Sequence, residues 1–150
     1  PIGRRHFWDI LSRLAREEGV AILITTHYVT EAEHCDALAL MYAGRVVAGG
    51  SPTSMKQAME REAGHLLELT TDRPWAAIKA LHEAGCPEAA LFGNRLHVLC
   101  AEHQRDGAKL REVLAAAGIA VRTLSVRPVS LEDVFVYRVM ALERQERQAG

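Results

Sequence analysis

One short apolar run constrains the fold of this chain more than any other feature. Residues 20–25 read Val-Ala-Ile-Leu-Ile-Thr, directly after a glycine and shortly before a histidine. A continuous apolar run of this length is typical of a strand that is buried on both faces, as in a parallel sheet. Residues 37–42 repeat the pattern and predict a second buried strand. The first part of the chain is therefore expected to have an α/β architecture.

An amphipathic helix is predicted ahead of this run. Phe7, Ile10, Leu11 and Leu14 have the spacing of one face of a helix. The helical pattern begins almost at Pro1, so the residue that normally caps a helix would lie upstream. We therefore expect the chain to be a piece of a longer protein.

A short helix and a hairpin are predicted between residues 30 and 48. Residues 30–36 begin with a threonine followed by acidic residues, a pattern typical of a helix start. Ala43 and Gly44 then predict a tight turn into a third strand at residues 46–48. A further helix is expected from residue 53 onward.

The pattern restarts after the polar stretch 60–64, and we place a boundary there between domains at residues 1–62 and 63–150. The second domain is expected to contain strands at 66–70, 89–92, 96–100 and 119–126 and helices at 74–84 and 107–117. This βαββαβ order is the split-βαβ or ferredoxin-like arrangement, an α+β fold. Trp75 is expected on the inner face of its helix. Ser130 is expected to cap a closing C-terminal helix.

Charge and cysteine content narrow the classes of function. The 18 basic and 19 acidic residues give a formal net charge of −1, which offers no electrostatic reason to bind nucleic acid or an acidic membrane. Cys35, Cys86 and Cys100 are widely spaced and predict free thiols in a reducing compartment. No apolar run approaches the roughly 20 residues that a membrane span needs. We therefore expect a cytoplasmic protein.

His27 is the strongest candidate for a catalytic or ligand-binding residue. It follows the first apolar run, at the carboxyl end of a predicted strand, where open α/β sheets bind their ligands. Its imidazole can donate a hydrogen bond to a phosphate oxygen or help to position an attacking water. By position alone, a histidine with only local hydrogen bonds explains the pattern better.

Three ordered motifs in residues 1–58 resemble the final part of an ABC transporter ATP-binding subunit. Residues 1–5 resemble the segment after the D-loop aspartate, residues 25–36 resemble the H-loop with its downstream helix, and residues 40–52 resemble the hairpin that closes the domain. The resemblance implies that His27 is the switch histidine, which contacts the γ-phosphate of ATP in the closed dimer.

A fourth motif lies near the C-terminus. Residues 127–135 are similar to the P-[ST]-L-E-D-V-F segment of multidrug and ABC-2 exporter ATPases, except for Val129 as an additional residue. Those subunits carry a small C-terminal domain after the ATPase core. The residues themselves predict that Pro128 ends a strand and that Glu132 and Asp133 complement the start of a helix. A catalytic pair of acids is the less favoured interpretation.

The motifs that bind and hydrolyse nucleotide are absent from the sequence. It contains no G-x-x-x-x-G-K-[ST], no Q-loop, no signature motif and no acidic residue after an apolar strand. We expect the chain alone to be catalytically inactive and to bind no cofactor. The resemblance implies that the longer protein uses ATP and Mg²⁺. It also implies a second ATP-binding subunit and a membrane permease as partners, the subunit being cytoplasmic and peripheral to the membrane.

Two other interpretations remain open. The second domain is alternatively a regulatory, dimerisation or small-ligand-sensing module, because fold alone does not define function. A zinc site from His97, Cys100 and His103 is disfavoured, because alternation along a strand places the first two on opposite faces.

The exposed apolar strands of residues 1–58 are expected to make the chain self-associate.

Overall fold

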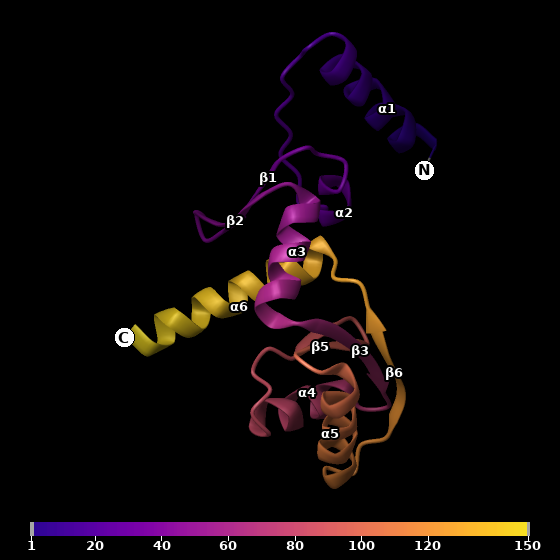
Figure 1. Ribbon diagram of the computed structural model, residues 1–150, viewed down its shortest axis with the longest axis vertical. Coiled ribbons are helices and arrows are strands. Elements are labelled where there is room, and N and C mark those ends of the chain that lie inside the picture. Colours follow the sequence, from indigo (N-terminus) through magenta and orange to yellow (C-terminus); the bar gives the residue numbers. More distant parts are fainter. Residues whose placement is uncertain (1, 150) are drawn as a thin grey trace.

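The computed structural model describes residues 2–149. Its elements in chain order are α1 (Ile2–Glu17), α2 (Val29–Ala32), β1 (Leu38–Tyr42), β2 (Arg45–Gly50), α3 (Pro52–Ala63), β3 (His65–Thr71), α4 (Pro74–Glu83), β4 (Ala90–Phe92), β5 (Arg95–Cys100), α5 (His103–Ala116), β6 (Val121–Arg127) and α6 (Leu131–Ala149). Figure 1 shows α1 at one end of an elongated molecule and a sheet with α4 and α5 at the other. The hairpin β1–β2 and helices α2, α3 and α6 lie between them.

Helix α1 forms as predicted, and Gly19 follows its last turn. That glycine has a φ of +69°, and Val20 N donates to Leu14 O over 3.2 Å, which closes the last turn. Phe7 is exposed, and the Trp8 ring stacks on His34 with centroids 4.9 Å apart. The apolar face of α1 is therefore only partly covered by the residues that the structure describes.

The predicted strand at residues 20–25 is not formed. This segment is extended but has no sheet partner within residues 2–149, and Leu23 is 96% exposed. A strand needs a neighbour to satisfy its backbone N–H and C=O groups, so an apolar sequence alone cannot produce one. The expectation of a strand buried on both faces is also wrong for β1, whose residues alternate between half-buried and exposed.

The hairpin β1–β2 confirms the predicted turn. Ala43 and Gly44 both have positive φ, +48° and +75°, as a two-residue turn between twisted strands requires. Tyr42 and Arg45 are the paired residues that flank it.

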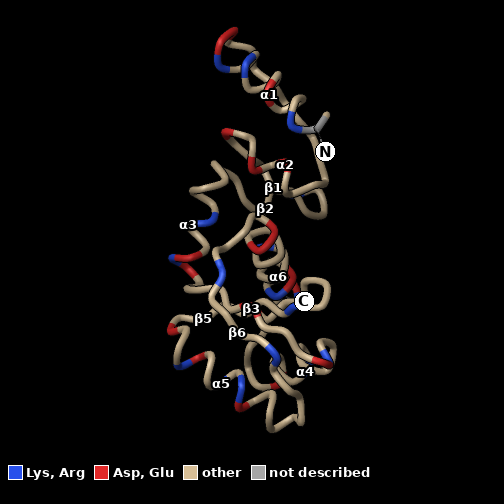
Figure 2. The backbone as a smooth tube through the Cα atoms, turned by 90° about the vertical axis from the view of Figure 1, so that its right-hand side faces the viewer, with Lys and Arg blue, Asp and Glu red and all other residues tan. Residues whose placement is uncertain are grey.

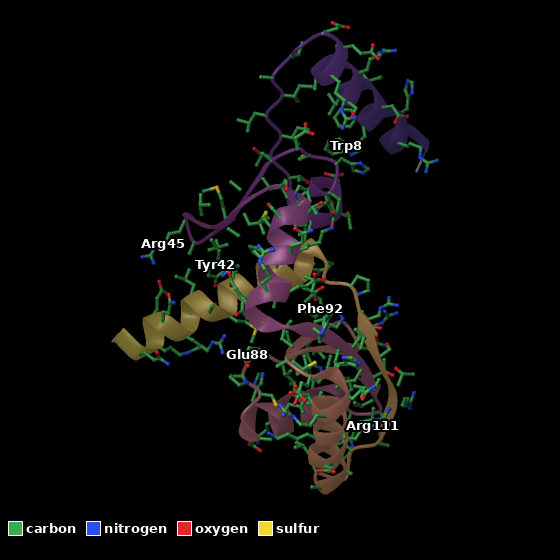
Figure 3. The ribbon with its side chains drawn as sticks, in the orientation of Figure 1. Trp8, Tyr42, Arg45, Glu88, Phe92 and Arg111 are labelled. Atoms are coloured by element: carbon green, nitrogen blue, oxygen red, sulfur yellow. The ribbon has the colours of Figure 1, made fainter. Side chains whose placement is uncertain are left out.

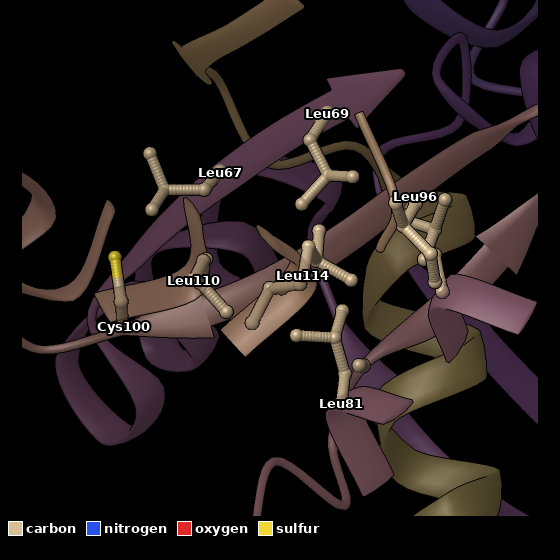
Figure 4. Packing of buried hydrophobic residues seen from close by; sticks show 11 residues of the cluster. Leu67, Leu69, Leu81, Leu96, Cys100, Leu110 and Leu114 are labelled. Carbon is tan, nitrogen blue, oxygen red and sulfur yellow. The ribbon is translucent and has the colours of Figure 1, made fainter. Parts of the chain in front are cut away.

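The second sheet has four antiparallel strands in the order β4-β5-β3-β6. The elements from β3 to β6 follow the βαββαβ order that the sequence predicts. Helices α4 and α5 cover one face of this sheet (Figure 4). The buried residues between the helices and the sheet form a cluster that we call the sheet core, which includes Leu67, Leu69, Leu81, Leu96, Val98, Cys100, Leu110 and Leu114. Trp75 corrects the sequence analysis: it is 77% exposed, because it lies in the first turn of α4 and the buried positions begin at Ala77.

Helix α6 packs on the opposite side of the sheet and also on the first part of the chain. We call its contact region the α6 cluster, whose buried members are Ala32, Met55, Met59, Leu66, Val129, Leu131 and Val134. These residues come from α2, α3, β3 and α6 together with the segment that precedes α6. The closing helix therefore contacts elements on both sides of the predicted boundary.

Polar contacts join α6 to the hairpin and to α3. Tyr42 Oη donates to Glu143 Oε1 over 2.8 Å and Arg45 Nη1 donates to Glu146 Oε1 over 2.9 Å, and both hairpin residues lie beside α6 in Figure 3. Arg138 Nη2 donates to Glu62 Oε1 over 2.9 Å. Acidic and basic residues are interspersed along the helices (Figure 2). Within residues 2–149, every helix is too short or too polar to cross a bilayer.

Candidate functional site

His27 lies in a turn between the extended segment and α2. Thr26 Oγ1 donates to Glu31 Oε2 over 2.7 Å and accepts from Tyr28 N over 3.0 Å. Helix α2 is shorter than the predicted 30–36, and its N-cap residue is Tyr28. The Thr26 hydroxyl, two residues before the N-cap, thus supplies hydrogen bonds at the start of α2. We expected residue 30 to provide the cap.

The His27 side chain is exposed to solvent. Its ring lies against Tyr28, with centroids 4.1 Å apart and planes inclined by 37°. An exposed imidazole on a turn with fixed neighbours can reach a ligand that approaches from outside the chain. The position is compatible with the expected phosphate contact, which stays a prediction.

Helix α2 is anchored although it has only four residues. Ala32 is buried in the α6 cluster beside Leu131 and Val134. Glu33, at the C-terminal end of α2, accepts from Lys56 Nζ of α3 over 2.9 Å. The turn that carries His27 is therefore attached to α3 and α6 through α2.

A second polar group of residues lies where α6 begins. Ser130 Oγ accepts from Asp133 N over 3.2 Å, and Asp133 Oδ2 accepts from Ser130 N over 2.9 Å, so the two residues form a reciprocal cap. Strand β6 ends before Pro128, and Val134 is buried. The predicted capping role of this segment is confirmed.

Asp133 also binds a residue that the sequence analysis did not connect with it. Its carboxylate is 3% exposed, and its Oδ1 lies 2.5 Å from Nδ1 of His97 on β5. The other ring nitrogen, Nε2, lies 3.3 Å from Glu68 Oε2, and Phe92 stacks on the ring with centroids 4.2 Å apart. With a carboxylate on each side, both ring nitrogens act as donors, which is the arrangement of a charged imidazolium.

The surroundings shift the pKa values of this pair in opposite directions. Burial alone would lower the pKa of His97, but the hydrogen bond and charge of Asp133, together with Glu68, raise it above its usual value. Burial alone would raise the pKa of Asp133, but the hydrogen bonds from His97 and Ser130 lower it. Both shifts favour the charged forms of His97 and Asp133, and so the ion pair between them.

His97 and Cys100 point to opposite faces of β5, as strand alternation predicts. Cys100 is buried in the sheet core, and its Sγ donates to His65 O over 3.4 Å. The His103 ring meets the His65 ring edge-on, with centroids 5.5 Å apart. Within residues 2–149 no three His, Cys, Asp or Glu side chains are grouped so that they could hold a metal ion.

A cleft of about 260 Å³ lies between α4, the following loop and α6. It is lined by His82, Pro87, Met140, Glu143, Arg144 and Arg147. Arg144 Nη1 lies 2.7 Å from Glu88 Oε1 and Arg147 Nη1 lies 4.0 Å from Glu143 Oε2, so acidic partners balance both guanidinium groups.

Comparison with known proteins gives a consistent set of relatives, although no protein-family profile matches the chain. The chain is 41% identical over 56 residues to the probable multidrug ABC transporter ATP-binding protein YbhF of Escherichia coli, which covers 37% of this chain and 10% of that protein. It is 33% identical over 145 residues to the phospholipid-transporting ATPase ABCA7 of Homo sapiens, covering 91% of this chain and 7% of that protein.

A bacterial exporter subunit is similar over almost the whole chain. The Nod factor export ATP-binding protein I of Burkholderia orbicola is 34% identical over 149 residues, which is 97% of this chain and 45% of that protein. The chain thus spans less than half the length of each of these relatives. By their names, these relatives are two ATP-binding proteins and one transporting ATPase. The chain is accordingly a homologue of the ATP-binding proteins of ABC transporters.

Proposed function

We propose that this chain is the C-terminal portion of the ATP-binding subunit of an ABC exporter. The observation that carries the proposal is the turn at His27, where an exposed imidazole lies between Thr26 and Tyr28, and Tyr28 N donates to Thr26 Oγ1. It lies within the motif that resembles the H-loop. The similarity to exporter subunits over nearly the whole chain supports the same assignment.

In this proposal His27 is the switch histidine of the longer protein. An imidazole N–H at this turn donates to the γ-phosphate of ATP, and it thereby reports whether the phosphate is present. When ATP and Mg²⁺ are bound, the metal supplies charge neutralisation for phosphoryl transfer.

The residues of this chain do not fit ATP and Mg²⁺ by themselves. The sequence has no glycine-rich loop with its lysine, and the described residues contain no cluster of possible metal ligands. We derive no catalytic step for the isolated chain, and we propose that it is neither an ATPase nor a nucleotide-binding unit alone.

We assign the two parts of the chain different roles. Residues 1–62 complete the ATPase domain with the D-loop tail, the H-loop and the closing hairpin. Residues 63–150 form an accessory ferredoxin-like domain with its terminal helix. The strand order β4-β5-β3-β6 and the βαββαβ order of elements support the ferredoxin-like assignment.

The partners follow from the family. The longer protein would pair with a second ATP-binding subunit and dock on a membrane permease, on the cytoplasmic side of the membrane. ATP hydrolysis would drive the closing and opening of the two subunits and thereby export. In the isolated chain, the exposed apolar segment 20–25 would instead promote self-association.

The second candidate function is a regulatory module. The cleft between α4 and α6 is the observation that favours it, because its volume approaches that of small-molecule sites, which begin at roughly 300 Å³. Its paired charges favour a neutral ligand over an ion.

Calorimetric titration with Mg²⁺-ATP tests the first candidate. The chain 1–150 is expected to show no binding, whereas the full-length protein that contains it is expected to show saturable binding. Saturable binding by residues 1–150 would contradict the proposal that the chain binds no nucleotide alone.

A further inference from the structure

The Thr26 hydroxyl is bonded to two residues that follow His27 in the chain. Thr26 Oγ1 donates to Glu31 Oε2 over 2.7 Å, and it accepts from the backbone N–H of Tyr28 over 3.0 Å. Both bonds connect Thr26 to residues on the other side of His27, and we call this pair of hydrogen bonds the bracket. The backbone at His27 therefore cannot rotate freely unless one of these bonds breaks.

The acidic end of this bracket is fixed to the body of the molecule. Glu31 belongs to α2, whose Ala32 is buried in the α6 cluster. Glu33, which follows α2, is bonded to Lys56 of α3. A group on an anchored helix can orient a neighbouring turn more accurately than a group on a free loop can.

The segment before the turn gives His27 much less support. Residues 20–25 pair with no strand among the described residues, and Leu23 is almost fully exposed. Within the described chain, the direction of the His27 ring therefore depends on the Thr26–Glu31 hydrogen bond and on the contact with Tyr28.

We propose that Glu31 is a positioning residue for His27, acting through the Thr26 hydroxyl to aim the imidazole at the phosphate. The inference rests on the proposed function of His27 and adds a residue to it. Glu31 itself need not touch the nucleotide. A displacement of about 1 Å at a reacting group can cost up to 100-fold in rate, so a fixed turn has a kinetic benefit.

The test uses the full-length protein and steady-state ATP hydrolysis. Glu31→Ala removes the bond from Thr26 to Glu31, and Thr26→Val removes that bond together with the one from Tyr28 N. Both variants are expected to lower kcat about ten-fold, the effect of one lost hydrogen bond to a charged group, with little change in KM. Thr26→Ser keeps the hydroxyl and should restore most of the wild-type kcat. Thr30→Val, on the exposed side of the same helix, is the matched control and should retain wild-type kcat and KM.

A double variant distinguishes positioning from general support of the fold. If Glu31 acts only through His27, Glu31→Ala added to His27→Ala should cause no further loss of kcat. A further loss of about ten-fold in the double variant would overturn the inference, as would wild-type kcat in both Glu31→Ala and Thr26→Val. If His27→Ala itself retains wild-type kcat, the proposed function fails. If His27→Ala is inactive while both bracket variants are unaffected, only the inference fails.

Discussion

The imidazole of His97 and the carboxylate of Asp133 are 2.5 Å apart at Nδ1 and Oδ1, although 36 residues separate them in the chain. Asp133 also completes the cap of α6 with Ser130. The Asp133 carboxylate thus caps the N-terminus of α6 and also bonds this helix to the four-stranded sheet. Helix α6 continues along the hairpin and α3, and its cluster includes Ala32 of α2, the helix that follows His27.

Replacing His97 by alanine should destabilise the protein by about 2 to 3 kcal/mol, because the buried Asp133 carboxylate would lose its charged partner. Chemical denaturation of residues 1–150 measures this loss. His103→Ala is the matched control, since His103 is an exposed histidine of the same sheet domain, and its effect should stay within about 0.5 kcal/mol. Equal effects of the two substitutions would show that the ion pair contributes no stability.

The contribution of His97 should depend on pH. Because the pKa of His97 is raised in the folded state, its stabilisation is complete below the unfolded-state value of about 6.5 and is lost as pH rises through the folded-state value. The difference in unfolding free energy between the wild type and His97→Gln should therefore be largest near pH 5 to 6 and shrink as pH rises through the raised folded-state pKa of His97.

On the acidic side the sign is reversed. The pKa of Asp133 is lowered, so its stabilisation is present above the unfolded-state value of about 3.9 and disappears as pH falls through the folded-state value. A stability difference between the wild type and His97→Gln that does not decrease as pH rises above about 6.5 would contradict a charged His97.

Loss of the α6 cap should cost about 1 kcal/mol, because Ser130→Ala removes the acceptor for the Asp133 N–H. Amide hydrogen exchange would show the change as faster exchange in the first turn of α6. Ser125→Ala, at an exposed position on β6, serves as the control. Faster exchange in both variants alike would mean that Ser130 has no specific capping role.

The exposed apolar segment should drive self-association of residues 1–150. Leu23 is 96% exposed, so Leu23→Asp should leave the unfolding free energy almost unchanged while it weakens association in sedimentation experiments. Trp75→Ala, at an exposed position on α4, should leave association unaffected. A wild-type chain that stays monomeric at high concentration would contradict the prediction.

The sequence predicts those elements whose determinants are local. The turn at Ala43 and Gly44, the end of β6 before Pro128 and the cap at Ser130 each depend on residues only a few positions apart. The four strands and two helices from β3 to β6 are likewise predicted in the right order, because each has its own apolar pattern.

Features that depend on distant partners are not predicted in the same way. The apolar pattern of residues 20–25 is that of a strand, but a strand forms only where a second strand pairs with it. The bond between His97 and Asp133 joins β5 to α6, so no local pattern around either residue predicts it. Two features of the sequence point to the bond between His97 and Asp133. Strand alternation places His97 away from the sheet core, and the carboxylate of a capping residue such as Asp133 can accept a second hydrogen bond.

ATP hydrolysis by the full-length protein, compared with its His27→Ala variant under conditions where both are folded, tests the assignment of His27 most directly. We predict that the wild type hydrolyses ATP and that the variant loses at least about 100-fold in kcat, the scale typical of losing a group that stabilises transferring phosphate. A variant that hydrolyses ATP at the wild-type rate would contradict the role proposed for His27.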